Sequence, residues 1–311
     1  MTYTLRKMKL TDTQSDINKD RNSYIGCSDI GTIMGVNPWK SPYTLWAEKT
    51  GKKPVEDISD KPAVWWGNAE EDLVAKYFTK VTGHKVRRSN FRYWVEELPF
   101  LYGHIDRMLT DMSAGLEIKT TSANNKTNYE EGDIPDSHYW QIQGYMLVTG
   151  MKQWYIATKR DNSVYIGIVE RNEEDIAKLV NACQTFWNCV TEGIPPKTDG
   201  KESTTETLNQ IFTPVQNRKH MLSDKADVIL SEIVEKEALI KQLQTEVEAL
   251  KNEIKNEMED CDTAEAEGYT VTWKPYIRQT FDSKKFKEDQ PGIYKLYTVG
   301  KETRRFVIKE K

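Results

Sequence analysis

Three residues on two short segments have the types and spacing for metal-assisted chemistry. Asp106 stands in "YGHIDRML", and Glu117 and Lys119 stand in "GLEIKTT", with ten residues between Asp106 and Glu117. Because side chains alternate between the two faces of a strand, Glu117 and Lys119 share one face and their apolar neighbours take the other. The intervening "TDMSAG" has the composition of a hairpin loop. It predicts antiparallel pairing that brings Asp106 close to Glu117.

Two carboxylates beside an ammonium group provide what a magnesium site needs. Mg²⁺ prefers oxygen ligands from one or two carboxylates and completes its shell with water and phosphate. A lysine next to the metal can position or activate an attacking water and offset charge in the transition state. The alternative is a surface cross-strand ion pair, worth about 0–1 kcal/mol. The spacing Asp-x10-Glu-x-Lys also arises by chance, so the rest of the chain has to decide.

The composition describes a long and highly charged chain. Its 311 residues suffice for one large domain or two smaller ones, 30% of them are charged, and the mean hydropathy is −0.71. Neither a run of 18 apolar residues nor a signal-like N-terminus is found, so we expect no membrane partner and a cytoplasmic location. Four cysteines without a CxxC pair indicate reduced thiols.

Residues 1–213 predict an α/β domain in which a strand meander is wrapped by helices. Helices are expected at 41–51, 68–83 and 173–193, and strands flank them. The helix at 68–83 is expected to pack through one apolar face, formed by Leu73, Val74, Tyr77, Phe78 and Val81. The Pro-, Gly-, Ser- and Thr-rich segment 193–210 predicts a linker.

Residues 214–311 predict a C-terminal extension built on a long heptad helix at 223–262. One core position holds Ile233, Ile240, Val247 and Ile254, and the other holds Ile229, Leu243 and Leu250. Lys236 and Glu257 interrupt the second position. β-branched residues at the first position with Leu at the second suit a two-stranded coiled coil, although packing on the same chain is an equal alternative.

The charge of this extension is divided between its two parts. Residues 223–262 carry a net charge of −7, and residues 273–311 carry +6. Alternating segments predict a small basic β unit at 269–311. Its cationic side chains could contact duplex backbone, recruit a partner protein or simply face solvent. They are Lys284, Lys285, Lys287, Arg304 and Arg305.

Four ordered motifs across about 18–195 resemble one nuclease family. They are "RNSYIGCSDIGTIMGVNPWKSPYTLW", "WWGNAEEDLVAKYF", "GHIDRMLTDMSAGLEIKTT" and "YWQIQGYMLVTG". Together they are similar to the YqaJ-type viral recombinases, relatives of lambda exonuclease within the PD-(D/E)xK nucleases. The resemblance implies a restriction-endonuclease-like core, a central mixed sheet flanked by helices. It also implies a Mg²⁺-dependent 5′→3′ exonuclease that digests one strand of double-stranded DNA and leaves 3′ overhangs.

The resemblance further implies cofactors and partners. Two Mg²⁺ ions are expected, with Mn²⁺ able to substitute. The expected partners are double-stranded DNA and a phage single-strand annealing protein, and the expected assembly is a homo-oligomer, a trimeric ring. The setting is the cytoplasm of a phage-infected bacterium.

The family motif assigns roles to residues of this chain. Asp106 and Glu117 match the metal ligands, with the Ile118 carbonyl as an additional ligand, and Lys119 matches the catalytic lysine. Glu71 falls at the helix carboxylate that supports a second metal.

Three further matches and their competitors complete the assignment. Gln141 matches the glutamine near the active-site waters, and Arg21 with Ser28 matches the pair that holds the 5′-terminal phosphate. Gln143 could replace Gln141, and the register at Glu71 could slip by one to its neighbours Glu70 and Asp72. His104 stands where relatives often have a small residue, and "HID" lacks the proline of the motif.

Two other functions remain open at this point. One is a structure-selective or restriction-like endonuclease with the same chemistry; the Arg21–Ser28 match favours the exonuclease, because an endonuclease needs no terminal phosphate. The other is a non-enzymatic DNA-binding or scaffold protein. The joint presence of Asp106, Glu117 and Lys119 speaks against it.

Overall fold

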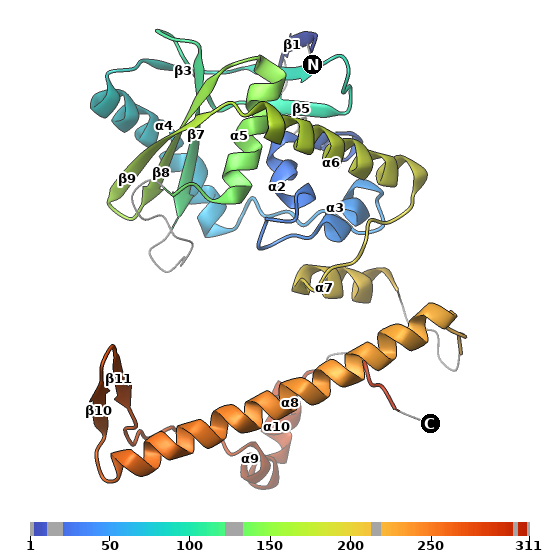
Figure 1. Ribbon diagram of the computed structural model, residues 1–311, viewed down its shortest axis with the longest axis vertical. Helices are drawn as coiled ribbons and strands as arrows, with labels where there is room; N and C mark the ends of the chain where they lie inside the picture. Colours follow the sequence, from blue (N-terminus) through green and yellow to red (C-terminus); the bar gives the residue numbers. More distant parts are fainter. Residues whose placement is uncertain (1–2, 11–20, 122–132, 213–218, 301–303, 310–311) are drawn as a thin grey trace. The chain divides into compact units, whose positions relative to one another are not determined.

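The computed structural model contains two compact units, Met1–Pro214 and Val215–Lys311 (Figure 1). The structure describes residues 3–10, 21–121, 133–212, 219–300 and 304–309. Among these residues, no helix combines the length and apolar character that crossing a bilayer requires.

A mixed five-stranded sheet forms the centre of the first unit, in the order β3-β6-β7-β8-β9. Its strands are β3 (Val86–Arg88), β6 (Arg107–Leu109), β7 (Ala114–Thr121), β8 (Gln153–Arg160) and β9 (Ser163–Glu170). β7 and β8 pair in parallel, and the other neighbours pair antiparallel. The central mixed sheet implied by the resemblance is therefore confirmed, as is the hairpin between β6 and β7.

A second sheet has the order β1-β4-β5-β2. Its strands are β1 (Leu5–Lys9), β2 (Ile25–Gly26), β4 (Phe91–Val95) and β5 (Leu101–His104). The segment "YGHIDRML" is not one strand, as the sequence had suggested. It ends in one sheet as β5 and restarts in the other as β6, with Ile105 and Asp106 between them. Ile105 is buried in the core, and Asp106 is thereby released from both ladders.

Helices α4 (Pro62–Thr82) and α5 (Asp136–Thr149) contact the five-stranded sheet. Further helices of this unit are α2 (Ile30–Ile33), α3 (Pro42–Lys49), α6 (Glu173–Glu192) and α7 (Glu202–Ile211). Successive side chains of β8 point alternately into two hydrophobic clusters. Trp154 and Ile156 belong to the larger cluster, and Tyr155 and Ala157 belong to the smaller one, which includes residues of α4. The sheet therefore lies between α4 and the layer that contains α5.

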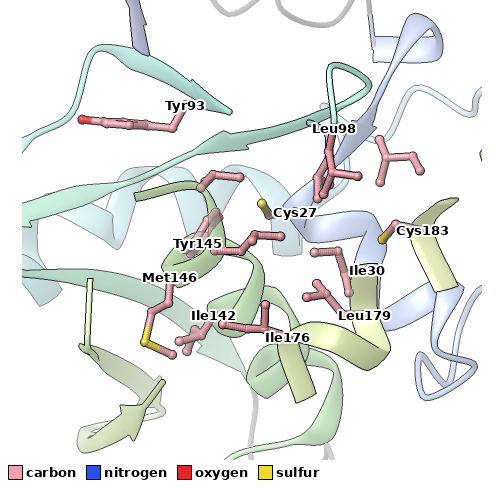
Figure 2. Close-up of a cluster of buried hydrophobic side chains, with 14 of the residues drawn as sticks. Cys27, Ile30, Tyr93, Leu98, Ile142, Tyr145, Met146, Ile176, Leu179 and Cys183 are labelled. Carbon is pink, nitrogen blue, oxygen red and sulfur yellow. The ribbon is translucent and has the colours of Figure 1, made fainter. Parts of the chain in front are cut away.

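Helix α5 is the centre of the larger core. Its residues from Gln141 to Val148 are all buried, which is typical of a helix surrounded by protein on every side. Figure 2 shows Ile142 and Met146 of α5 among Ile30 of α2 and Leu179 of α6. A helix held this tightly fixes the direction of each side chain that it carries.

Helix α4 packs through a narrower face than the sequence predicts. Val74, Ala75 and Phe78 are buried, whereas Leu73, Tyr77 and Val81 of the expected face are exposed. The buried residues pack with Leu116 and Ile118 of β7, so the contact of α4 with the sheet includes only part of the apolar face expected from the sequence.

The predicted linker at 193–210 is wrong for its second half, which forms α7. Thr204 and Thr207 are buried, and the Thr207 hydroxyl lies 2.9 Å from that of Thr44 on α3. Lys201 donates to the carbonyls of Gly35 and Asn37. Serine and threonine serve here as contacts between helices, so their abundance did not indicate a free linker.

The second unit contains α8 (Asp224–Met258), a hairpin and two short helices. The hairpin pairs β10 (Thr263–Ala266) with β11 (Tyr269–Thr272) around Gly268, whose φ is +85°. The helices are α9 (Ser283–Asp289) and α10 (Pro291–Tyr297). The basic β unit expected at 269–311 is therefore wrong beyond β11: among the described residues after Thr272 the regular elements are helices.

We predict that Gly115→Ala destabilises the first unit by about 1–3 kcal/mol through overpacking. A Cβ at Gly115 would lie 2.1 Å from the ring of Trp154, its partner on β8, which is fully buried. The measurement is denaturant unfolding followed by tryptophan fluorescence. Gly200→Ala is the control, because a Cβ there meets nothing within 4 Å. Equal midpoints for the two variants would contradict the packing described here.

Candidate active site

Asp106 and Glu117 meet where β6 begins beside β7. The register pairs Arg107 with Leu116, so the next positions along the two strands are Asp106 and Glu117. The backbone N–H of Ile118 donates to Oδ2 of Asp106 at 3.3 Å. Glu117 is 2% exposed. The structure thus brings the two carboxylates together as the hairpin predicted.

Lys119 and Gln141 close a ring of polar contacts around Glu117. Lys119 Nζ lies 2.6 Å from Glu117 Oε1 and donates to Gln141 Oε1 at 3.2 Å. Gln141 Nε2 donates to the same Glu117 oxygen at 2.8 Å and to the Tyr145 hydroxyl at 2.7 Å. On the opposite face of β7, Leu116 packs in the core with α4. The alternation of charged and apolar residues therefore separates a site from a core.

The structure distinguishes Gln141 from Gln143. Gln143 is fully buried, donates to the Glu170 carbonyl and accepts from the Asn172 N–H. It joins α5 to the chain that leads into α6, and only Gln141 of this pair contacts the carboxylates. The sequence could not separate them, since the rotation of α5 depends on what surrounds it.

Three consecutive acids of α4 have three different partners. Glu70 forms an ion pair with Lys159, whereas Glu71 forms one with Arg107 at 2.5 Å. Asp72 is shared between Arg107 at 2.6 Å and Arg88. Of these acids, Glu71 is the one that lines the cavity containing Asp106. The structure therefore brings Glu71, and not Glu70, to the site.

Arg107 is a site residue that the sequence reasoning missed. Its side chain is 5% exposed, reaches Glu71 and Asp72, and donates to the Asp106 carbonyl at 2.9 Å. A buried arginine needs partners for its charge, and α4 supplies them. The available signal was an arginine directly after the candidate metal ligand, at a position of the strand that faces the core.

The site opens into a cavity of about 650 Å³. Residues from four separate parts of the chain line it, including Arg21, Ser28, Glu71, His104, Asp106 and Tyr145. Both members of the expected phosphate pair thus share a cavity with Asp106 and Glu71.

Arg21 is held in place from both ends. Its Nη2 donates to Ser28 Oγ at 2.8 Å, and its carbonyl accepts from Lys49 Nζ at 2.7 Å. Lys49 also lies 3.0 Å from Asp29, and Arg21 lies 3.8 Å from the same carboxylate. Burial alone would raise the pKa of Asp29, but the Lys49 and Arg21 charges outweigh it and lower that pKa. The sequence reasoning missed Asp29 and Lys49, although Asp29 directly follows Ser28 in the chain.

His104 lines the cavity without a cationic charge. Burial, with the charges of Arg92 and Arg21, lowers its pKa to about 4. Arg92 Nε donates to His104 Nε2 at 3.4 Å. The imidazole is therefore neutral at pH 7 and accepts from an arginine.

The carboxylates fit a divalent cation. Burial, followed by the Glu117 charge, raises the pKa of Asp106 well above its usual value. Oε2 of Glu117 is buried and has no hydrogen-bond partner in the described part of the chain. A hard cation would satisfy that oxygen and offset the charge repulsion.

Two carboxylates make an incomplete set of ligands. Within the ranges that the structure describes, no group of three or more His, Cys, Asp or Glu side chains could hold a metal ion. Asp106 and Glu117 are the candidate ligands, since Glu71 is engaged by Arg107. A Mg²⁺ ion bound by one or two carboxylates completes its shell with water and substrate phosphate. The Ile118 carbonyl and Glu71 stay predicted ligands.

Comparison with known proteins identifies the family. "Uncharacterized protein YqaJ" of Bacillus subtilis (strain 168) is 34% identical over 320 residues, covering 99% of this chain and 99% of the relative. The chain belongs to the YqaJ family. The family model described as "YqaJ-like viral recombinase domain" matches residues 17–152, a range that contains every site residue proposed from the sequence. Membership in this family supports a DNA nuclease of the lambda-exonuclease type.

Solved structures resemble part of the YqaJ-family chain at low identity. An alkaline exonuclease, LHK-Exo of Laribacter hongkongensis, is 17% identical, covers 58% of this chain and 94% of its own, and has a TM-score of 0.49. A phage related exonuclease of Haemophilus somnus 129PT is 16% identical, covers 57% and 99%, and has a TM-score of 0.38. These two likenesses do not carry the family assignment, which rests on the relative that matches the whole chain.

We predict that Asp106→Asn stabilises the metal-free protein and removes its response to divalent metal. The amide keeps an acceptor for the Ile118 N–H and ends the repulsion with Glu117. The expected gain in EDTA is about 1–3 kcal/mol, the cost of a poorly compensated buried polar group. Thermal unfolding with EDTA, Mg²⁺ and Mn²⁺ measures both effects. A variant that Mg²⁺ stabilises as much as the parent would exclude Asp106 as a ligand.

Proposed function

We propose that this YqaJ-family chain is a Mg²⁺-dependent 5′→3′ exonuclease acting on double-stranded DNA. It digests one strand and leaves 3′ single-stranded overhangs for phage recombination by annealing. The observation that carries the proposal is the cavity that Asp106 shares with Arg21 and Ser28, with Glu117 and its Lys119 partner next to Asp106 on the neighbouring strand. The carboxylates with Lys119 suit phosphodiester hydrolysis, and the Arg21–Ser28 pair suits a terminal phosphate.

Bound Mg²⁺, or Mn²⁺ in its place, would activate water and stabilise the leaving 3′ oxygen. Asp106 and Glu117 would hold the ion, and the buried, unpartnered oxygen of Glu117 supports this role. A second ion near Glu71 requires that carboxylate to leave Arg107, whose guanidinium would still have Asp72 as a partner.

The chain's own groups orient the reacting atoms. Lys119 keeps an ammonium group 2.6 Å from Glu117, where it can hold a water and lower the cost of negative charge on phosphorus. The Gln141 amide forms hydrogen bonds with Glu117, Lys119 and Tyr145. These three bonds restrict rotation of the amide, which in turn holds the Glu117 side chain in place. Preorganised groups of this kind need little rearrangement during the reaction.

The Arg21–Ser28 pair supports an exonuclease over an endonuclease. An arginine fork binds phosphate bidentately, and Ser28 adds a hydroxyl at 2.8 Å from the guanidinium. A terminal phosphate has more free oxygens than an internal phosphodiester, so such a pocket selects strand ends. The annealing partner and the trimeric ring follow from the resemblance alone and stay predictions.

We predict that the protein digests linear duplex DNA from 5′-phosphorylated ends in Mg²⁺ and is inactive in EDTA. Duplexes labelled at either terminus, with 5′-phosphate or 5′-hydroxyl ends, separate the direction of digestion from the choice of end. Lys119→Met should lower the rate by about 10²–10⁴-fold, the range for a group that assists proton transfer. Cleavage of closed circular or branched DNA without end preference would instead support the endonuclease.

We further predict that Arg21→Gln reduces the preference for phosphorylated ends. The loss of a charge-assisted contact should lower kcat/KM on 5′-phosphorylated duplex by about 10–100-fold. Activity on 5′-hydroxyl duplex should fall much less. Arg6→Gln is the control, because Arg6 is an exposed arginine on β1 whose ion-pair partner is Glu96. Equal losses on both kinds of end would exclude Arg21 as the phosphate contact.

A further inference from the structure

Helix α8 carries a narrow apolar stripe that stays exposed. Its five residues are 44–60% exposed and alternate at spacings of three and four along two heptads. They are Ile240, Leu243, Val247, Leu250 and Ile254. A helix on a globular core usually has a broader apolar face, whereas a two-position stripe is the seam of a coiled coil.

The surface of this stripe is hollowed in the pattern that a coiled coil requires. Ile240, Leu243, Gln244 and Val247 line one hollow, flanked by Glu248 and Lys251. In heptad order these four residues occupy positions a, d, e and a. In coiled coils, a side chain at a or d inserts between four residues of the facing helix. A leucine at position d of a parallel partner would enter this hollow, and Leu243 of an identical helix stands at that height.

We propose that α8 pairs with α8 of a second copy of this chain as a parallel, in-register, two-stranded coiled coil. Position a holds Ile240, Val247 and Ile254, and position d holds Leu243 and Leu250. β-branched residues at a with leucine at d favour two strands over three or four. In register, the stripe gives five consecutive apolar layers.

One charge pair beside the five apolar layers suits the parallel register. Glu246 at position g would face Lys251 at position e of the second copy, an attractive pair. On its own helix Lys251 lies 3.5 Å from Glu248. Both side chains are exposed, so replacing this ion pair with one to Glu246 of the second copy costs little free energy. Nearer the start of the helix, Glu232 at position g would face Glu237 at position e of the second copy, a like-charge pair, and Lys236, which lies 3.2 Å from Glu232, would lie beside both.

An antiparallel pair fits the same helix less well. If Leu243 faced Val247 of the other copy, Lys236 would face Ile254 and Ile233 would face Glu257. Each charge would then lie against an apolar residue at a core layer, where an uncompensated charge is costly. In the parallel arrangement Lys236 faces Lys236 and Glu257 faces Glu257, and these two like-charge layers lie outside the five apolar layers.

Pairing in twos differs from the three-fold ring that the resemblance implies, and the two are separable. The coiled coil depends on the stripe of α8, whereas a ring of nuclease units does not require that stripe. Loss of association on changing the stripe is therefore specific to the coil.

The test compares full-length chains with two lysines on the seam or on the opposite face. Val247→Lys with Leu250→Lys places both charges in the core. Thr245→Lys with Asn252→Lys, at position f, adds the same charge outside it. We expect the seam variant to raise the dissociation constant of α8 pairing by about a hundredfold or more, and the control to leave it unchanged. Molar mass by light scattering over a range of concentrations measures this, and circular dichroism checks that the helix is retained.

Each outcome decides the proposal. A molar mass that falls from two chains in the parent to one chain in the seam variant supports the proposal. A fall from six chains to three also supports it, and in that case the coiled coil joins two rings. The same mass for the parent and the seam variant overturns it, including the case in which the stripe packs on its own chain. Three falling to one overturns the two-stranded coil.

Cysteine cross-linking tests the parallel register. In a Cys261→Ser background, Leu250→Cys should give a covalent dimer on oxidation, because position d faces itself across a parallel pair. Asn252→Cys, on the outer face, should not. A chain that associates through the stripe without cross-linking at position 250 would overturn the parallel arrangement.

Discussion

Two carboxylates that lie side by side away from water are the constraint on which the first unit depends. Asp106 and Glu117 repel each other, and burial adds to the cost, as the raised pKa of Asp106 indicates. Three groups reduce the cost without removing it: the Ile118 N–H, the Lys119 ammonium and the Gln141 amide. One oxygen of Glu117 still lacks a partner among the described residues. A fold that places such a pair away from water keeps a candidate cation site at the expense of stability.

The surroundings of this pair are arranged so that neither carboxylate can move away. Helix α5 is buried on all sides, so Gln141 approaches Glu117 from a fixed direction. On the other face of the sheet, Arg107 joins β6 to the acids of α4. The position of Glu71 relative to Asp106 is therefore set by a buried ion pair. Such pairs contribute little net stability but fix geometry, because breaking one leaves a charge without compensation.

What the sequence could predict was what short-range geometry determines. The alternation around Glu117 and the hairpin before it depend on neighbours within a few residues, and both are confirmed. The choice of Glu71 over Glu70 and of Gln141 over Gln143 depends on how two helices rotate against the sheet. No local pattern contains that rotation. The same reason explains α4, where Leu73 stays exposed and Ala75 is buried.

The second unit is stabilised differently. Met258 is the only α8 side chain that is buried in the part of the chain described, although α8 has 35 residues. Most helical stability in proteins comes from packing an amphipathic face, and surface ion pairs such as Lys236–Glu232 add only about 0.2–0.5 kcal/mol each. A helix of this length with an apolar seam therefore needs a partner to cover the seam. A second copy of α8, parallel and in register, presents an apolar residue opposite each apolar residue of the seam. An unrelated surface would have to match this spacing by chance.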